Sequence, residues 1–183
     1  MKKPVLIGFL IVTALLFMSG CGEEESPVLS PSQKPPLLDG AVTPEEYSLS
    51  YDFDTLKLFL SRSGDVIFLG LVSTLPGWAA VGVGSDKMNG AVMIIGYVRD
   101  GEAVVTEQLG TGHRHSPSEP GDGILRASAI TERNGLVSLE VELPVSAVIP
   151  DGAAAFPVLI AASDTDSFSE YHSIRREVTV RIE

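Results

Sequence analysis

The sequence of 183 residues contains a single cysteine, Cys21, and this scarcity excludes several kinds of site. One cysteine leaves no partner for a disulfide within the chain. It also cannot supply a cysteine-rich zinc site, ligate an iron–sulfur cluster or make the Cys-x-x-Cys-His attachment of haem. Any cofactor of this protein must therefore be held without covalent bonds from sulfur.

Basic residues are also few. There are 13 lysines and arginines against 24 aspartates and glutamates, which gives a formal net charge of −11 at pH 7. Nucleic acids and anionic lipid headgroups are recognised through basic surfaces. The charge balance therefore argues against both as partners.

Sequence patterns typical of common enzymes are missing as well. We find no Ser/His/Asp order, no spaced pair of carboxylates and no phosphate-binding glycine loop at a junction between a strand and a helix. The glycines of residues 82–84 precede a predicted strand, so we assign them to the sheet. The sequence predicts a protein that is not an enzyme.

The first 21 residues are typical of an exported protein. Two lysines precede an apolar run over residues 5–17, which is too short to span a bilayer comfortably. The following Met18-Ser19-Gly20-Cys21 resembles the lipobox of bacterial lipoproteins. We therefore predict a signal peptide over 1–20 and a lipid on Cys21, which would anchor an extracytoplasmic domain to the cell membrane or the outer membrane. An ordinary secretory signal and an uncleaved anchor helix are the alternatives.

Residues 21–37 are polar and rich in proline, so we predict that the lipidated Cys21 is followed by a flexible tether. Residues 38–183 then form one domain of ordinary size for a single core. Short apolar, β-branched runs separated by turn residues predict about ten strands, and no window shows a sustained helical period. This pattern is typical of an antiparallel β-sandwich. The predicted strands cover residues 47–53, 56–60, 65–73, 78–84, 91–99, 102–109, 124–132, 136–143, 155–162 and 172–182. In the first of them, Tyr47, Leu49, Tyr51 and Phe53 are expected on one face.

Two neighbouring segments are candidates for a binding site. Residues 77–84 place three glycines around Trp78, which indicates a close approach of some group to the backbone or a bulged core strand. Residues 85–90 form a polar loop that contains Met88 between Lys87 and Asn89. A thioether there either points into a pocket or fills a gap in the core. Met93, in the middle of a strand, is expected only to fill the core.

The three histidines of the chain are further candidates. His113 and His115 are two residues apart and could share a metal, but the serines and prolines around them favour an exposed loop. Their role stays open. His172 begins the last predicted strand, where a lone histidine is most often solvated or hydrogen-bonded.

Several short motifs follow one another along the chain. They are Leu38-Asp39-Gly40, Glu46-Tyr47, the glycine-rich Trp78 strand, Met88-Asn89-Gly90-Ala91, the hairpin at 95–101, Gly110-Thr111-Gly112-His113, Asn134-Gly135-Leu136 and Tyr171-His172-x-x-Arg175. Their order resembles that of DOMON domains, and the resemblance covers essentially all of residues 38–183. At one position, Arg176, bacterial relatives often have glycine, and we expect this difference to alter a turn.

The resemblance implies an immunoglobulin-like sandwich and, for the type that includes the cytochrome domain of cellobiose dehydrogenase, a haem b bound without covalent bonds. The axial ligands of that type are a methionine and a histidine in loops at one end of the sandwich, and they fall on Met88 and His172. Trp78 would line the pocket, and Arg175, Lys87 or Arg114 would meet the propionates. The expected apolar walls are Trp78, Val81, Val83, Val92, Ile94 and Phe156.

Methionine and histidine fill both axial positions of haem iron, which leaves one-electron transfer as the natural function. We therefore expect a redox partner protein or a membrane electron carrier. Other DOMON-like domains bind sugars, so the alternative is a non-catalytic module that binds a carbohydrate or another small ligand. In that case Tyr47, Tyr51, Trp78 and Tyr97 would be the candidate stacking residues.

Overall fold

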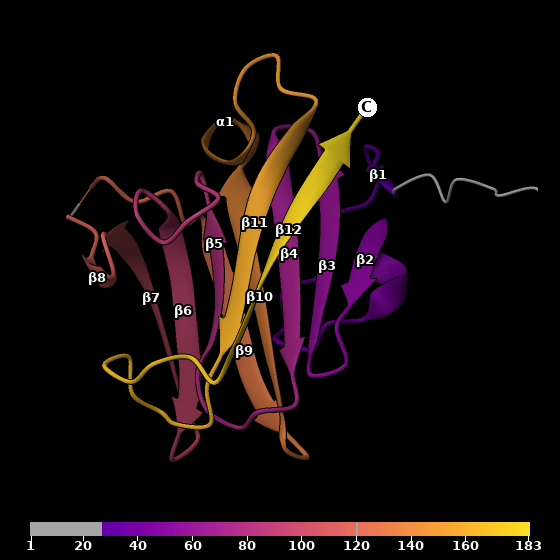
Figure 1. Cartoon of the computed structure of the whole chain (residues 1–183). Helices are drawn as coiled ribbons and strands as arrows, with labels where there is room; N and C mark the ends of the chain where they lie inside the picture. The colour runs from indigo at the N-terminus through magenta and orange to yellow at the C-terminus, as the bar shows by residue number, and fades with distance from the viewer. Residues whose placement is uncertain (1–26, 120) are drawn as a thin grey trace, which may run out of the picture.

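The computed structural model describes residues 27–119 and 121–183 and confirms the expected all-β sandwich (Figure 1). The signal peptide, Cys21 and the first part of the tether lie outside these residues. The strands are β1 (Val28–Leu29), β2 (Leu49–Asp52), β3 (Leu56–Ser63), β4 (Val66–Ser73), β5 (Ala79–Val83), β6 (Val92–Arg99), β7 (Glu102–Thr111), β8 (Arg114–Pro117), β9 (Ala127–Arg133), β10 (Leu136–Pro144), β11 (Ala155–Ala162) and β12 (Ile174–Ile182).

The strands form two sheets that pack face to face. The larger sheet has seven strands in the order β1-β12-β11-β5-β6-β7-β8, and the smaller has five in the order β2-β3-β4-β10-β9. Pairing within the sheets is antiparallel, except that β1 runs parallel to β12. The described residues also contain two short helices, the 3-10 helix Pro44–Glu46 and α1 (Val145–Val148). Within this part of the chain, no helix has the length and apolar character needed to cross a membrane.

Two hairpins form where dipeptides in the sequence predict them. Asp100-Gly101 joins β6 to β7 and Asn134-Gly135 joins β9 to β10, and all four residues have positive φ. Asn-Gly and Asp-Gly are favoured in such two-residue turns because both positions need left-handed backbone. These turns set the register of two of the strand pairs.

The core lies between the two sheets and consists of alternate residues from each strand. In β5 and β6, Val81, Val83 and Ile94 are fully buried there. Side chains alternate across a strand, so Ala80 and Ile95 point to the outer face of the larger sheet. They are nevertheless buried, because they form a separate cluster with Trp78.

The outer face of the smaller sheet is covered by the segment 38–47. Tyr47 packs there against Phe59 and Phe68, whereas Leu49 belongs to the main core. The prediction that Tyr47 and Leu49 share a face was therefore wrong. The extended strand begins only at Leu49, after the 3-10 helix Pro44–Glu46, so the alternation does not reach back to Tyr47.

The chain joins the sandwich earlier than the expected boundary at residue 38. Val28 and Leu29 pair with Arg181 and Ile182 of β12, and Leu29 is completely buried in the main core. The backbone N–H of Ser32 donates to the Arg62 carbonyl at 2.6 Å. Val28 and Leu29 of the segment expected to be a tether are thus part of the larger sheet, and Ser32 is bonded to β3 of the smaller sheet.

Candidate functional site

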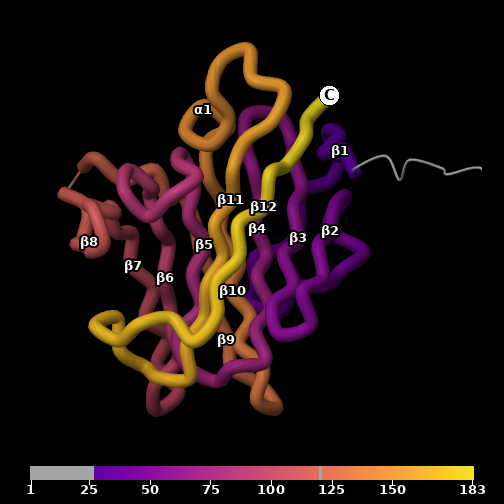
Figure 2. Tube along the Cα trace, viewed as in Figure 1, coloured from indigo at the N-terminus to yellow at the C-terminus, as the bar shows by residue number. Residues whose placement is uncertain are grey.

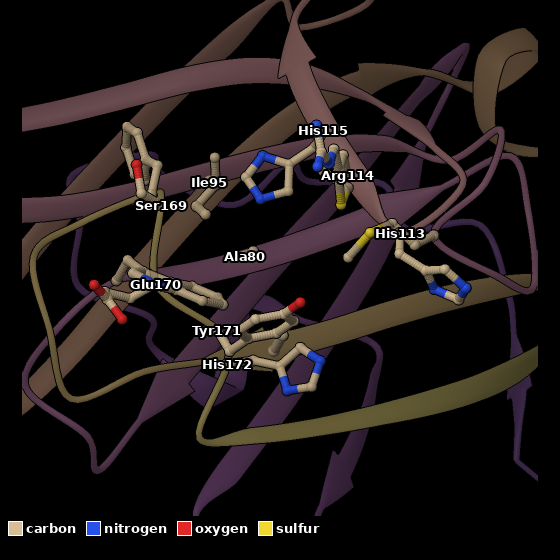
Figure 3. A pocket seen from close by; sticks show the side chains of 14 residues that line it. Ala80, Ile95, His113, Arg114, His115, Ser169, Glu170, Tyr171 and His172 are labelled. Carbon is tan, nitrogen blue, oxygen red and sulfur yellow. The ribbon is translucent and has the colours of Figure 1, made fainter.

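A cavity of about 370 Å³ lies on the outer face of the larger sheet, rather than at an end of the sandwich (Figure 3). Its floor consists of the outward side chains of β5, β6 and β11, including Ala80, Ile95 and Ala161. Alanines leave room above the sheet, and loops on either side form the walls. A second hollow of about 650 Å³ adjoins it, and the two share Met88, Met93, His113, Ala161 and His172.

The apolar lining of this cavity differs from the expected one in the face that the strands present. Val81, Val83, Val92, Ile94 and Phe156 were expected to form walls, but they lie in or against the core between the sheets. The outward neighbours of Val81 and Ile94 line the cavity instead, because a shift of one residue moves a side chain to the opposite face of a strand. Met93, expected to fill the core, is among them. The outward apolar residues are Ala80, Met93, Ile95 and Ala161, joined by Trp78 and Phe168.

Met88 is half-buried, and hydrogen bonds hold its loop against the end of β7. The N–H of Gly90 donates to the Gly110 carbonyl and that of Gly110 to the Ala91 carbonyl, both at 2.9 Å. The N–H of Gly112 donates to Asn89 Oδ1 at 2.8 Å. These bonds join residues 88–91 to the motif at 110–112, so the two motifs together position the thioether.

Gly110 is essential to this arrangement, because a Cβ there would overlap the Met88 carbonyl oxygen. We expect Gly110→Ala to displace the Met88 loop and to lower the free energy of unfolding by about 1–3 kcal/mol, as overpacking usually does. Gly123→Ala is the control, since the nearest contact of its Cβ would be a Glu107 carboxylate oxygen at 3.3 Å and not a backbone atom. Denaturant unfolding of both variants checks the prediction, and equal stabilities would contradict it.

His172 borders the same cavity from across the outer face of the sheet, in the loop that leads into β12. The N–H of Ser173 donates to the Ala162 carbonyl at 2.8 Å, and Ser163 Oγ donates to the Tyr171 carbonyl at 3.3 Å. The loop 163–173 also reaches over β6, where Phe168 packs on Tyr97 with ring centroids 4.7 Å apart (Figure 2). His172 is half-buried and lines both hollows together with Met88.

Trp78 lines the smaller cavity and is 5% exposed. Its indole N–H is buried and has no hydrogen-bond partner among the residues that the structure describes. A buried donor without a partner costs about 1–3 kcal/mol, and such groups need an explanation. A bound ligand with an acceptor atom at this wall would provide one.

Cationic side chains surround the larger hollow. Lys87, Arg175 and Arg176 line it, together with Asp86 and Glu177. Arg175 is paired with Ala161 and therefore shares the cavity face of the sheet. Within residues 27–119 and 121–183, none of the three cations forms an ion pair.

Arg176 does not lie in a turn, contrary to expectation. It is inside β12, paired with Ile160 of β11. Arg114, which was also expected to bind an anionic group, lines the smaller cavity.

The two neighbouring histidines have different environments. His113 is exposed in a turn, whereas His115 lies in β8 and is half-buried, so the expected exposed loop is wrong for His115. His115 Nδ1 is hydrogen-bonded to Oε1 of the buried Gln108. In the described part of the chain, no three His, Cys, Asp or Glu side chains are grouped as a metal site.

The candidate stacking residues for a sugar are not gathered in one place. Tyr47 is 9% exposed and is buried against the outer face of the smaller sheet. Tyr51 packs on Phe53, also on the smaller sheet. Trp78 and Tyr97 lie on the outer face of the larger sheet. Tyr171, which was not among the candidates, lines the cavity and is 83% exposed.

No family model and no curated protein matches this sequence, but solved structures share its fold. The cytochrome b domain of pyranose dehydrogenase from Coprinopsis cinerea has a TM-score of 0.56 over 74% of this chain and 81% of its own, at 16% identity. The cytochrome domain of Myriococcum thermophilum cellobiose dehydrogenase gives 0.50 over the same shares, at 12% identity. A family 9 carbohydrate-binding module from Caldicellulosiruptor kristjanssonii, solved with cellotriose, gives 0.50 over 86% of this chain and 94% of its own, at 11% identity. The chain therefore has the sandwich fold of cytochrome b domains, which a sugar-binding module also shares.

Proposed function

We propose that this protein binds haem b without covalent bonds, through Met88 and His172, and transfers single electrons outside the cytoplasm. One observation carries the proposal. Met88 and His172 belong to distant parts of the sequence, yet both line the same two adjoining hollows. A thioether and an imidazole are the donor pair of cytochromes whose iron has both axial positions filled.

The remaining residues of the site fit such a group. The floor is apolar, with Ala80, Ile95 and Ala161, as a macrocycle requires. Cavity volumes of about 370 and 650 Å³ lie in the range of small-molecule and cofactor sites. Lys87 and Arg175 supply cations for two carboxylates, and the indole N–H of Trp78 supplies a donor.

The protein's own residues would tune the cofactor. Haem supplies an iron that changes reversibly by one electron, and a methionine ligand raises its potential. His172 and Met88 would hold the iron and fill the positions that oxygen or substrate would need. The apolar floor would exclude water from the macrocycle.

Export and lipidation at Cys21 are part of the same proposal. A lipid on Cys21 would keep the domain at a membrane surface, since each buried CH₂ contributes about 0.8 kcal/mol to anchoring. The electron donor or acceptor would then be a redox partner protein or a membrane electron carrier. This proposal requires no catalytic residue in the chain.

The second candidate function is a non-catalytic module that binds a carbohydrate, and the fold shared with a family 9 carbohydrate-binding module supports it. The placement of the aromatic residues speaks against it. Tyr47 is buried and Trp78 is 5% exposed, so neither presents an open face to a sugar ring. Among the tyrosine, tryptophan and phenylalanine side chains that the structure describes, Tyr171 alone combines high exposure with a position on the cavity wall.

A titration of the full-length chain, purified in detergent, with haem b separates the two functions. We expect a sharp Soret band at one haem per chain and a reversible change of the spectrum on reduction. Cello-oligosaccharides are expected to leave the melting temperature unchanged. A colourless protein whose melting temperature rises with sugars would contradict the haem proposal and support the second function.

A further inference from the structure

His115 has an arrangement that its neighbour His113 lacks. It lies in β8, opposite Gly110 of β7, and its Nδ1 is hydrogen-bonded to Oε1 of Gln108. Gln108 is 5% exposed, and its register partner Met93 lines the cavity. A buried carboxamide therefore fixes the orientation of this imidazole from behind.

The hydrogen bond also determines which ring nitrogen is free. An amide oxygen only accepts, so Nδ1 is the donor in this contact, and in that tautomer of the neutral ring Nε2 keeps its lone pair. Metal-binding histidines almost always donate their other N–H to a carboxylate, a carbonyl or water. The amide oxygen of Gln108 is such a partner for His115, and the contact is present in the structure without a metal.

The free nitrogen belongs to a ring on the cavity wall. His115, Met88 and His172 all line the 370 Å³ cavity. In Figure 3 the rings of His115 and His172 lie on opposite sides of the space above Ala80, and the ring of His113 points away from it. The cavity thus offers His172 two possible partners, the thioether of Met88 and the imidazole of His115.

We propose that Met88 and His115 are alternative ligands for the iron position opposite His172, with His115 favoured in the ferric state and Met88 in the ferrous state. This proposal rests on haem binding at the site. A soft thioether prefers the lower oxidation state, and an imidazole stabilises the higher one and lowers the potential. Gln108 is then a positioning residue, which acts through His115.

The spin state of the ferric full-length protein tests the proposal, with Met88→Leu as the first variant. Leucine keeps the volume of methionine but cannot bind iron. We expect ferric Met88→Leu to remain six-coordinate and low-spin, because His115 fills the vacated position. Met88→Leu combined with His115→Phe should become five-coordinate and high-spin. The matched control, Met88→Leu combined with His113→Phe, should stay low-spin.

Gln108 is tested in the same background. Gln108→Leu, added to Met88→Leu, is expected to weaken ligation by His115 about 10- to 100-fold, as loss of an outer hydrogen bond usually does, and so to give a partly high-spin spectrum. Gln108→Glu keeps an acceptor and should restore the low-spin form. A purely structural role of Gln108 would change the melting temperature without changing the spin state.

The outcomes separate this proposal from haem binding itself. A high-spin ferric Met88→Leu variant would overturn the role of His115 and leave ligation by Met88 and His172 intact. A low-spin Met88→Leu/His115→Phe variant would overturn it as well, because another ligand would then be present. A wild-type chain that takes up no haem would overturn both the proposed function and this inference.

Discussion

Replacing His172 by alanine is expected to lower the affinity for haem b by about 100-fold or more. Loss of an outer-shell partner alone typically costs 10- to 100-fold in metal affinity, and His172 is proposed as a direct ligand. It lines both hollows and is the ligand that Met88 and His115 would share. Titration of the full-length variant, followed at the Soret band, measures the loss.

The control for this prediction is His113→Ala. His113 also lines both hollows, but it is exposed, and its ring points away from the space between His115 and His172 (Figure 3). Its removal should leave the haem affinity within about twofold of the wild type. Both variants should keep the stability of the apoprotein within about 0.5 kcal/mol, as substitutions away from the core usually do. Equal haem affinities for the two variants would remove His172 as a ligand.

Replacing Glu140 by alanine is expected to lower the free energy of unfolding by about 3–5 kcal/mol. Glu140 is completely buried and accepts hydrogen bonds from Tyr47 Oη at 2.7 Å and from the N–H groups of Asp39 and Gly40 at 3.0 and 2.8 Å. Without the carboxylate, three buried or half-buried donors lose their acceptor, and each costs about 1–3 kcal/mol. Denaturant unfolding of the apoprotein gives the change.

Two further variants define the origin of that loss. Glu142→Ala, two residues along the same strand, removes a half-buried carboxylate that takes no part in this network and should cost under about 1 kcal/mol. Tyr47→Phe removes one donor from Glu140 and should cost about 1.5–3 kcal/mol. Glu140→Ala, Glu142→Ala and Tyr47→Phe should all bind haem if they fold, because Glu140 lies in the smaller sheet and the cavity lies on the larger one. A neutral Glu140→Ala would contradict the prediction.

The pH dependence of stability offers an independent reading of the same network. Burial, and then the hydrogen bond to Glu140, raise the pKa of Tyr47 well above its ordinary value of about 10. The folded state therefore retains a proton that the unfolded chain releases above about pH 10. The contribution of Tyr47 is fully present below that pH and is lost above it, by up to about 1.4 kcal/mol per pH unit. Tyr47→Phe should lack this component of the decline.

Much of the fold could be predicted because its causes are local. The Asp100-Gly101 and Asn134-Gly135 turns follow from the backbone preferences of adjacent residues, and ten strands appear as short apolar runs. The strands β1 and β8 could not be predicted in this way. They contain two and four residues, and they are held by pairing with β12 and β7.

The same distinction applies to the site. Met88, Trp78, His172 and Arg175 could be singled out because their residue types and motif order resemble those of a family. The cavity walls could not, because strands such as β5 are apolar on both faces and their alternation carries no sign of which face is outward. The pairing of Gln108 with His115 was missed as well, since β8 was not predicted and the sequence does not show which residues face each other across β7 and β8.

By itself the sequence determined which chemistry is available: one cysteine near the N-terminus, three histidines, few cations, and strands without a helical period. The tertiary structure alone decided which of these groups meet. It placed β5 between β11 and β6, so that the loops carrying Met88 and His172 border one hollow, and it added β8 to bring His115 to the same wall. The reason is physical: side-chain types and turn preferences are properties of neighbouring residues, whereas a cavity exists only where distant strands pair and leave small side chains facing outward.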